Sequence, residues 1–134
     1  MTSIRRFLSR IFALVAIAAI ALTGCANAGG LTGNYQEDTL TMVNAMREAI
    51  ELPQDAPNRA EIQAQTKELI NAYAARYRRD GSVGKLNSFT TVRTAINSLA
   101  GHYNSASNRP IPKKLKDRLS SELRKVEVAL DRGY

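Results

Sequence analysis

The stretch Phe89-Thr-Thr-Val-Arg-Thr-Ala-Ile-Asn-Ser-Leu-Ala-Gly-His-Tyr103 decides the fold class of this 134-residue chain. Its large apolar residues recur at alternating intervals of three and four positions: Phe89, Val92, Ile96, Leu99 and Tyr103. This spacing places them on one side of an α-helix and is typical of a helix that packs along a bundle seam. The stretch therefore predicts a helix over about residues 87–104.

The segment of about residues 34–52 is expected to form an earlier helix. Asn34 and Glu37 have the spacing of an N-terminal capping pair, and Pro53 ends the apolar pattern. The apolar residues between these signals recur at helical intervals: Leu40, Val43, Met46 and Ile50.

Two more helices are expected, one over about residues 58–79 and one from about Pro112 to near Gly133. Asn58 and Glu61 repeat the capping signal, and a proline is tolerated in the first turn of a helix because the amides of that turn have no partner within the helix. Their apolar faces consist of Ile62, Leu69, Ile70, Tyr73 and Tyr77 in the former and of Leu115, Leu119, Leu123, Val126 and Leu130 in the latter.

The four segments together define the expected fold class. No segment combines strict alternation of apolar and polar residues with β-branched side chains, so we expect no sheet. The connections are about five to eight residues long, which favours antiparallel neighbours. The sequence predicts an all-α protein in which residues 34–134 form an up-down-up-down antiparallel four-helix bundle after an N-terminal lipoprotein signal peptide.

Residues 1–24 have the pattern of an export signal. Arg5, Arg6 and Arg10 precede an uninterrupted apolar run from Ile11 to Leu22, which leads into the lipobox-like sequence Leu22-Thr-Gly-Cys25. As a helix, this run would rise about 18 Å, which is short of the roughly 30 Å hydrocarbon core of a bilayer. A cleaved signal peptide is therefore favoured over a permanent transmembrane helix.

Cys25 is the expected lipid attachment site. Its thiol would accept diacylglycerol and its freed amine an N-acyl chain such as palmitate, which together give stable membrane anchoring. An ordinary signal peptide with an incidental cysteine is the alternative. Because residues 26–32 are rich in glycine and other small residues, we expect residues 25–33 to form a lipidated N-terminus and flexible tether.

The charge of the chain argues against a nucleic-acid-binding protein. The formal net charge is +7, but three of the 19 basic residues precede Cys25, which leaves 16 basic and 12 acidic residues, a net charge of about +4. The chain has no tryptophan and no basic run interleaved with aromatic residues. We expect no nucleic-acid partner, whereas an anionic partner or membrane surface suits the moderate positive charge.

The sequence offers no constellation for catalysis, a metal or a cofactor. His102 and Cys25 are the only histidine and cysteine, so neither a zinc site nor a haem attachment motif can be built. Gly81 and Gly84 do not have Walker spacing, and no serine lies in a nucleophile elbow. We expect a protein that is not an enzyme, with no catalytic residue, metal or cofactor, and with His102 hydrogen-bonded or exposed at a helix end.

Two basic clusters remain as interaction candidates. The first lies in the last turn of the second helix, where the helix dipole favours cations and a solvated helix end also explains it: Arg76, Arg78 and Arg79. The second opens the fourth helix, where the dipole disfavours cations: Arg109, Lys113, Lys114 and Lys116. Alternating helix directions place the second cluster beside an acidic group that would neutralise part of its charge: Glu48, Glu51, Asp55 and Glu61.

Several motifs, spread over nearly all of the chain after the signal, carry a resemblance to a known family. They are Leu31-Thr-Gly-Asn-Tyr35 with Glu37-Asp-Thr39, Tyr77-Arg-Arg-Asp80, Ser88-Phe89, Asn97-Ser-Leu-Ala-Gly-His-Tyr103, Asn108-Arg-Pro-Ile-Pro112 and Val126-Glu-Val-Ala-Leu-Asp-Arg132. Together they resemble the small lumenal lipoproteins of photosystem II assembly and repair, which occur in cyanobacteria with relatives in chloroplasts.

The resemblance implies a four-helix bundle and a non-enzymatic assembly factor that is lipid-anchored through Cys25 on the lumenal side of the thylakoid membrane. It implies binding to immature photosystem II, chiefly to the large lumenal loop of the chlorophyll-binding inner antenna subunit next to the reaction centre. Binding would precede assembly of the manganese cluster and extrinsic subunits. The alternative function is a small-molecule or haem-binding periplasmic lipoprotein with a pocket inside the bundle.

The partner-facing surface of this expected monomer is placed around the second turn and the adjoining helices. The candidate residues are Arg76, Tyr77, Arg78, Asp80, Phe89 and Arg93. Tyr77 and Phe89 are equally compatible with a place in the core.

Overall fold

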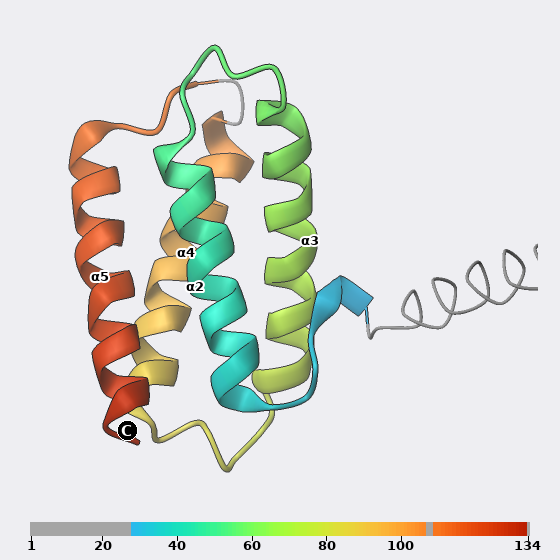
Figure 1. The fold of residues 1–134 in the computed structure, drawn as a ribbon, viewed down its shortest axis with the longest axis vertical. Helices are drawn as coiled ribbons and strands as arrows, with labels where there is room; N and C mark the ends of the chain where they lie inside the picture. The colour runs from blue at the N-terminus through green and yellow to red at the C-terminus, as the bar shows by residue number, and fades with distance from the viewer. Residues whose placement is uncertain (1–27, 107–108, 134) are drawn as a thin grey trace, which may run out of the picture.

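The computed structural model describes residues 28–106 and 109–133, whose helices form a four-helix bundle (Figure 1). The elements are a short 3₁₀ segment, η1 (Ala28–Gly30), and the helices α2 (Tyr35–Glu51), α3 (Arg59–Tyr77), α4 (Asn87–Ala106) and α5 (Lys113–Asp131). Successive helices run in opposite directions, which confirms the up-down-up-down topology. The described residues contain no strand.

The four helices occupy the corners of the bundle in the order α3, α2, α5, α4. α2 packs against both α3 and α5, whereas α4 packs closely against α5 and more loosely against α3. α3 and α5 are therefore diagonal partners, and Figure 1 shows them on opposite sides of the bundle. Within the described ranges, none of the helices combines the length and apolar character that crossing a bilayer requires.

The core consists of the apolar faces that the sequence spacing predicts. All five seam residues of α4 are at most 5% exposed: Phe89, Val92, Ile96, Leu99 and Tyr103. Four residues of α5 face them from the neighbouring corner of the bundle: Leu119, Leu123, Val126 and Leu130. Three residues that the spacing also places on apolar faces are only partly buried, so these faces are narrower than expected: Leu40, Ile62 and Leu115.

The helices begin close to the positions that the sequence signals predict, but the cap hydrogen bonds and backbone angles differ in part. The Asn34 side chain accepts a hydrogen bond from the Glu37 amide (3.1 Å), as expected of an N-cap. Asn58 occupies the N-cap position of α3, so the start signal is confirmed in position, but its φ of −95° and ψ of 11° are not extended and its side chain makes no cap hydrogen bond. Pro112 is the N-cap of α5 rather than a first-turn residue, because its ψ of 144° is extended.

The ordered domain begins before residue 34, so the expected tether over residues 25–33 is too long. Leu31 is 3% exposed and belongs to the core. The amides of Thr32 and Gly33 are bound by the carboxylate of Asp38. These contacts fix the segment that was expected to be flexible. The rest of that tether, Cys25 with it, and the expected signal peptide lie outside the described residues, and both stay predictions.

Gly29 allows η1 to lie directly on α3. Its φ is +77°, and a Cβ built on it would lie 2.8 Å from the Cβ of Ala72. A side chain at this position would be strained by the backbone conformation and would collide with α3. The close approach of η1 determines that the chain enters the bundle along α3, diagonally opposite α5.

Leu123→Ala is expected to lower the free energy of unfolding by about 2–5 kcal/mol, because the fully buried leucine leaves a cavity in the core. Ile96→Ala on α4 should have an effect in the same range. Urea denaturation of the purified variants measures both. Val128→Ala is the control on α5, since Val128 is 43% exposed and its loss should cost well under 1 kcal/mol. An effect of Leu123→Ala as small as that of the control would contradict the assignment of Leu123 to the core.

Candidate functional site: the corner between α3 and α4

The six candidate partner-facing residues come from the end of α3, the turn that follows it and the first half of α4. Asp80 shapes the turn, since its Oδ1 accepts hydrogen bonds from the amide (2.9 Å) and the hydroxyl (2.5 Å) of Ser82. These hydrogen bonds lower the pKa of Asp80 below its usual value. Val83, which is 5% exposed, anchors the turn to the core. Asp80 and Val83 therefore fix the conformation of the turn, and with it the positions of the basic residues beside the turn.

Arg78 and Arg93 line a shallow groove between α3 and α4. The groove has a volume of about 320 Å³, and its lining includes the apolar residues Phe89 and Ile96. Both arginines are exposed, and neither lies within ion-pair distance of a described carboxylate. Two cations above a small apolar floor suit an acidic, partly apolar partner segment.

Tyr77 and Phe89 are core residues, and their expected role on the partner-facing surface is not supported. They are 2% and 5% exposed. The Tyr77 hydroxyl donates a hydrogen bond to Asp38 Oδ2 (2.5 Å), and its ring packs against Tyr73 with centroids 4.8 Å apart. Both residues lie on the apolar faces that the helical spacing predicts, and they are buried for this reason. Phe89 still lines the groove, but as a buried residue.

Arg76 lies apart from Arg78 and Arg93. Its Nε is 4.0 Å from Asp38 Oδ2, and its guanidinium lies over the Tyr77 ring, 6.0 Å from the centroid. A Cβ built on Gly33, whose φ is +94°, would lie 2.5 Å from Arg76 Nη2, so the guanidinium rests on bare glycine backbone. The candidates therefore divide into Arg76 beside the N-terminal segment and a corner surface formed by Arg78, Asp80 and Arg93.

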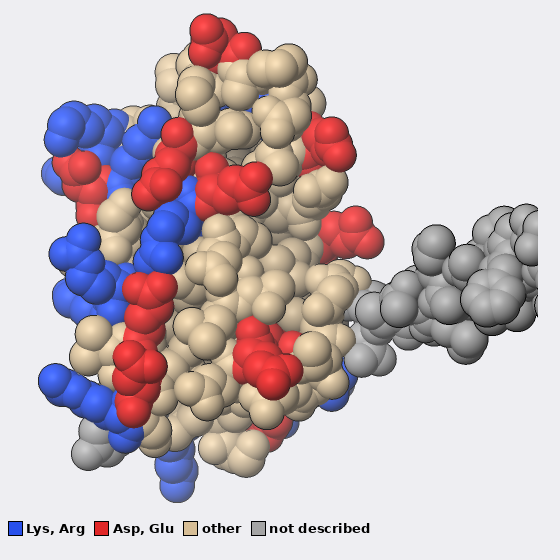
Figure 2. Space-filling view, in the orientation of Figure 1, with Lys and Arg blue, Asp and Glu red and all other residues tan. Residues whose placement is uncertain are grey.

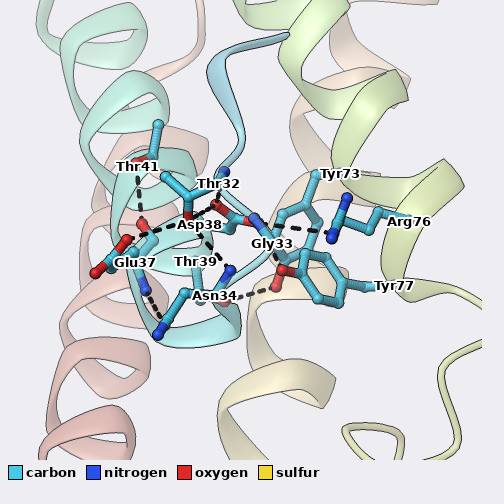
Figure 3. Close-up of polar contacts among 10 residues, drawn as sticks. All are labelled: Thr32, Gly33, Asn34, Glu37, Asp38, Thr39, Thr41, Tyr73, Arg76 and Tyr77. Atoms are coloured by element: carbon cyan, nitrogen blue, oxygen red, sulfur yellow. Dashed lines mark hydrogen bonds and ion pairs between the residues drawn. The ribbon is translucent and has the colours of Figure 1, made fainter. Parts of the chain in front are cut away.

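Asp38 is the centre of a buried polar network that the sequence reasoning missed (Figure 3). Its Oδ1 accepts hydrogen bonds from the amide (2.6 Å) and hydroxyl (3.0 Å) of Thr32, and its Oδ2 from the Gly33 amide (3.0 Å) and the Tyr77 hydroxyl. Burial raises the pKa of Asp38, but the hydrogen bonds outweigh burial and hold this pKa below its usual value. Burial, with the hydrogen bond to Asp38, raises the pKa of Tyr77 to about 12. The network therefore consists of an ionised aspartate and a neutral tyrosine.

Two further hydroxyl pairs extend this polar layer across the same end of the bundle. Thr39 and Tyr73 join α2 to α3 with a hydroxyl distance of 2.8 Å, and Tyr35 and Ser88 join α2 to α4 with one of 2.9 Å. The signal in the sequence was Asp38 itself, which lies four residues before the buried Met42 on the apolar face of its helix. An aspartate at such a position is costly unless it is fully hydrogen-bonded, so it marks a network whose partners only the fold reveals.

The basic cluster at the start of α5 forms no described ion pair with the acidic group that was expected to neutralise part of its charge. Lys113 instead pairs with Asp117 one turn along its own helix (2.7 Å). Among the described residues, no ion pair joins the cluster to Glu48, Glu51, Asp55 or Glu61.

His102 Nε2 lies 3.3 Å from the carbonyl oxygen of Arg109, which agrees with the expected hydrogen-bonded residue near a helix end. In the part of the chain that the structure describes, no three His, Cys, Asp or Glu residues are grouped to hold a metal.

Residues 3–130 match the family model described as Photosystem II Pbs27. The chain belongs to this family. It is 53% identical over 133 residues to Photosystem II lipoprotein Psb27 of Synechocystis sp., with 99% of each chain covered. It is 50% identical over 129 residues to Photosystem II assembly factor lipoprotein Psb27 of Thermosynechococcus vestitus, with 96% of each covered. The solution structure of Psb27 from cyanobacterial photosystem II is similar in fold, with a TM-score of 0.75, 55% identity and coverage of 82% of this chain and 96% of that one.

In this member of the Pbs27 family, Asp38→Asn is expected to lower the free energy of unfolding at neutral pH by about 1–3 kcal/mol, because an amide cannot accept hydrogen bonds at both side-chain positions. The pKa of Asp38 is lower in the folded than in the unfolded chain. Its stabilisation is therefore present above the unfolded pKa of about 4 and is lost as the pH falls through the folded pKa. In Asp38→Asn, the free energy of unfolding should no longer fall between neutral and acidic pH by the amount that Asp38 contributes.

Urea denaturation of the parent chain and the variant at about pH 7 and about pH 3 measures both effects. Asp55→Asn is the matched control, because Asp55 is exposed in the loop after α2. Equal stability of parent and Asp38→Asn at both pH values would show that the buried carboxylate does not stabilise the fold.

Proposed function

We propose that this chain is a non-enzymatic assembly and repair factor of photosystem II. The observation that carries the proposal is the family match over residues 3–130, together with a relative, 50% identical, whose name describes a photosystem II assembly factor lipoprotein. The protein binds immature photosystem II on the lumenal side of the thylakoid membrane, chiefly through the lumenal loop of the inner antenna subunit next to the reaction centre. Binding precedes assembly of the manganese cluster and extrinsic subunits.

Lipid on Cys25 keeps the factor in the membrane that contains its target. Diacylglycerol and an N-acyl chain together are enough for stable anchoring. Cys25 lies three residues before Ala28, where the described chain begins to pack on α3. The anchor thus confines the bundle close to the membrane surface, which raises its effective concentration at a membrane-bound partner.

The corner surface is the proposed contact with the photosystem. Arg78 and Arg93 are exposed and have no described carboxylate within ion-pair distance, so their charges remain available to an acidic loop. Exposed cations of this kind steer association and fix register. Asp80 supports the surface by holding the turn through Ser82. This proposal retains three of the six candidate residues as contacts or support, and leaves Tyr77 and Phe89 to the core.

Cys25→Ser is expected to leave the fold intact and to release the protein from membranes, because residue 25 precedes the described bundle and carries the proposed anchor. Fractionation of cells that express the variant, with a high-salt wash of the membranes, measures retention, and the melting temperature of the purified protein checks the fold. Cys25→Ser protein that stays on membranes through the wash would exclude lipid as the principal tether.

Arg78→Glu combined with Arg93→Glu is expected to reduce the recovery of photosystem II with the tagged protein by about tenfold or more, since two attractive contacts become repulsive. The experiment is a pull-down from solubilised photosynthetic membranes, with the bound complexes identified and assayed for manganese and oxygen evolution. The parent chain should recover inactive, manganese-free complexes that contain the inner antenna subunit.

The matched control for this experiment is Lys114→Glu, an exposed charge reversal on α5 at the opposite end of the bundle, in the second basic cluster, which this proposal does not use. It should recover as much photosystem II as the parent chain. Recovery of only unrelated complexes by the parent chain would overturn the proposed function. Unchanged recovery by the double variant would move the contact away from the corner surface.

A further inference from the structure

A second groove lies between the start of α4 and the second half of α5. Its volume is about 420 Å³, and its lining includes Val128 and Ala129 together with the basic side chains Arg124, Lys125 and Arg132. Val128 is 43% exposed, and among the described residues no other large apolar side chain is as exposed. Figure 2 shows that basic side chains gather over α5, at the left of the view. We call this feature the α4–α5 groove.

The basic side chains of the α4–α5 groove form no ion pair within the described part of the molecule. Three acidic residues of α5 already have partners: Asp117 pairs with Lys113, Glu122 with Arg118 and Glu127 with Arg47 of α2. By contrast, no described carboxylate lies within ion-pair distance of Arg124, Lys125 or Arg132, and no acidic residue lines the groove.

Helix electrostatics accounts for only one of these three cations. Arg132 is the C-cap of α5, where the helix dipole favours positive charge. Arg124 and Lys125 lie more than one turn before the end of the helix, beyond the reach of that effect. Their placement around a groove lined by Val128 and Ala129 therefore points to an external anionic partner with an apolar component.

The geometry of the chain entry argues against the bilayer as that partner. The three residues from Cys25 to Ala28 can span at most about 10 Å, even when fully extended. A lipid on Cys25 therefore holds the α3 side of the bundle nearest the membrane, because η1 packs on α3. α5 is the diagonal partner of α3 and lies on the opposite side of the bundle (Figure 1). A groove that is lined mainly by α5 therefore lies on the side away from that membrane. This step rests on the lipid anchor of the proposed function.

We propose that the α4–α5 groove binds an acidic protein segment, which places an apolar side chain against Val128 and Ala129 while its carboxylates pair with Arg124, Lys125 and Arg132. A concave floor suits an inserted side chain better than the plane of a lipid surface. The proposal gives the factor a second docking surface, separate from the corner surface of Arg78 and Arg93. A protein with both surfaces occupied would hold two segments of an assembling complex at once.

The test is a photo-crosslinking amino acid at position 128 in the full-length, membrane-anchored chain. After irradiation of photosynthetic membranes, mass spectrometry maps the attachment site. The expected adduct is a protein segment in which at least two acidic residues flank an apolar one. Arg124→Glu combined with Lys125→Glu should reduce the yield of this adduct by about tenfold or more, whereas Lys114→Glu on the same helix should leave it unchanged.

Four outcomes would overturn the proposal: adducts with lipid, adducts with a second copy of this chain, adducts with a segment that lacks acidic residues, or no adduct. An adduct that persists in the Arg124→Glu and Lys125→Glu variant would also overturn it. Recovery of photosystem II through the tag, measured on the same membranes, separates this test from that of the proposed function. If photosystem II is recovered but no adduct forms, only the proposal for the α4–α5 groove is overturned. If the adduct forms but no photosystem II is recovered, only the proposed function is overturned.

Discussion

A carboxylate that leaves water must be met by hydrogen-bond donors, and the start of this bundle is organised around that requirement at Asp38. Four hydrogen bonds satisfy its two oxygens, three of them from Thr32 and Gly33 and one from Tyr77. Because the donors come from the N-terminal segment and from α3, the ionised form of Asp38 joins these elements to α2. Loss of any donor would leave a buried charge incompletely paired, so the N-terminal segment, the start of α2 and the end of α3 stabilise one another.

The same requirement determines how the chain enters the bundle. Thr32 and Gly33 are bound to Asp38, Leu31 lies in the core, and Gly29 allows η1 to lie against Ala72 of α3. A lipid on Cys25 would thus act on a segment that is fixed to one side of the bundle. The anchor would restrict orientation as well as distance, which distinguishes it from a long flexible leash.

The core and the candidate binding surfaces make different demands on the sequence. The seam residues of α4 and α5 are buried against one another and supply stability. Arg78 and Arg93 at the corner and the cations along the α4–α5 groove lie outside this core and form no ion pair with a described carboxylate. Changes of these cations are expected to alter binding with little effect on folding, because exposed charges contribute little to stability. The two proposed docking surfaces can therefore be tested separately from the fold.

Helical spacing alone determined the class of fold, the four helices and most of the core, because a period of three to four residues requires no knowledge of distant partners. The capping signal at Asn34 succeeded for the same reason, since the atoms concerned are three residues apart. The signal at Asn58 placed the start of α3 correctly, but the backbone there is not extended and the side chain makes no cap hydrogen bond.

Tertiary structure decided what depends on contacts between distant residues. It placed Tyr77 and Phe89 in the core, separated Arg76 from Arg78 and Arg93, and matched Asp38 with a tyrosine 39 residues away. It also fixed Leu31 and Thr32 in a segment whose composition indicates flexibility. Spacing identifies the face of a helix on which a residue lies, but only the packing of all the helices determines what that face meets.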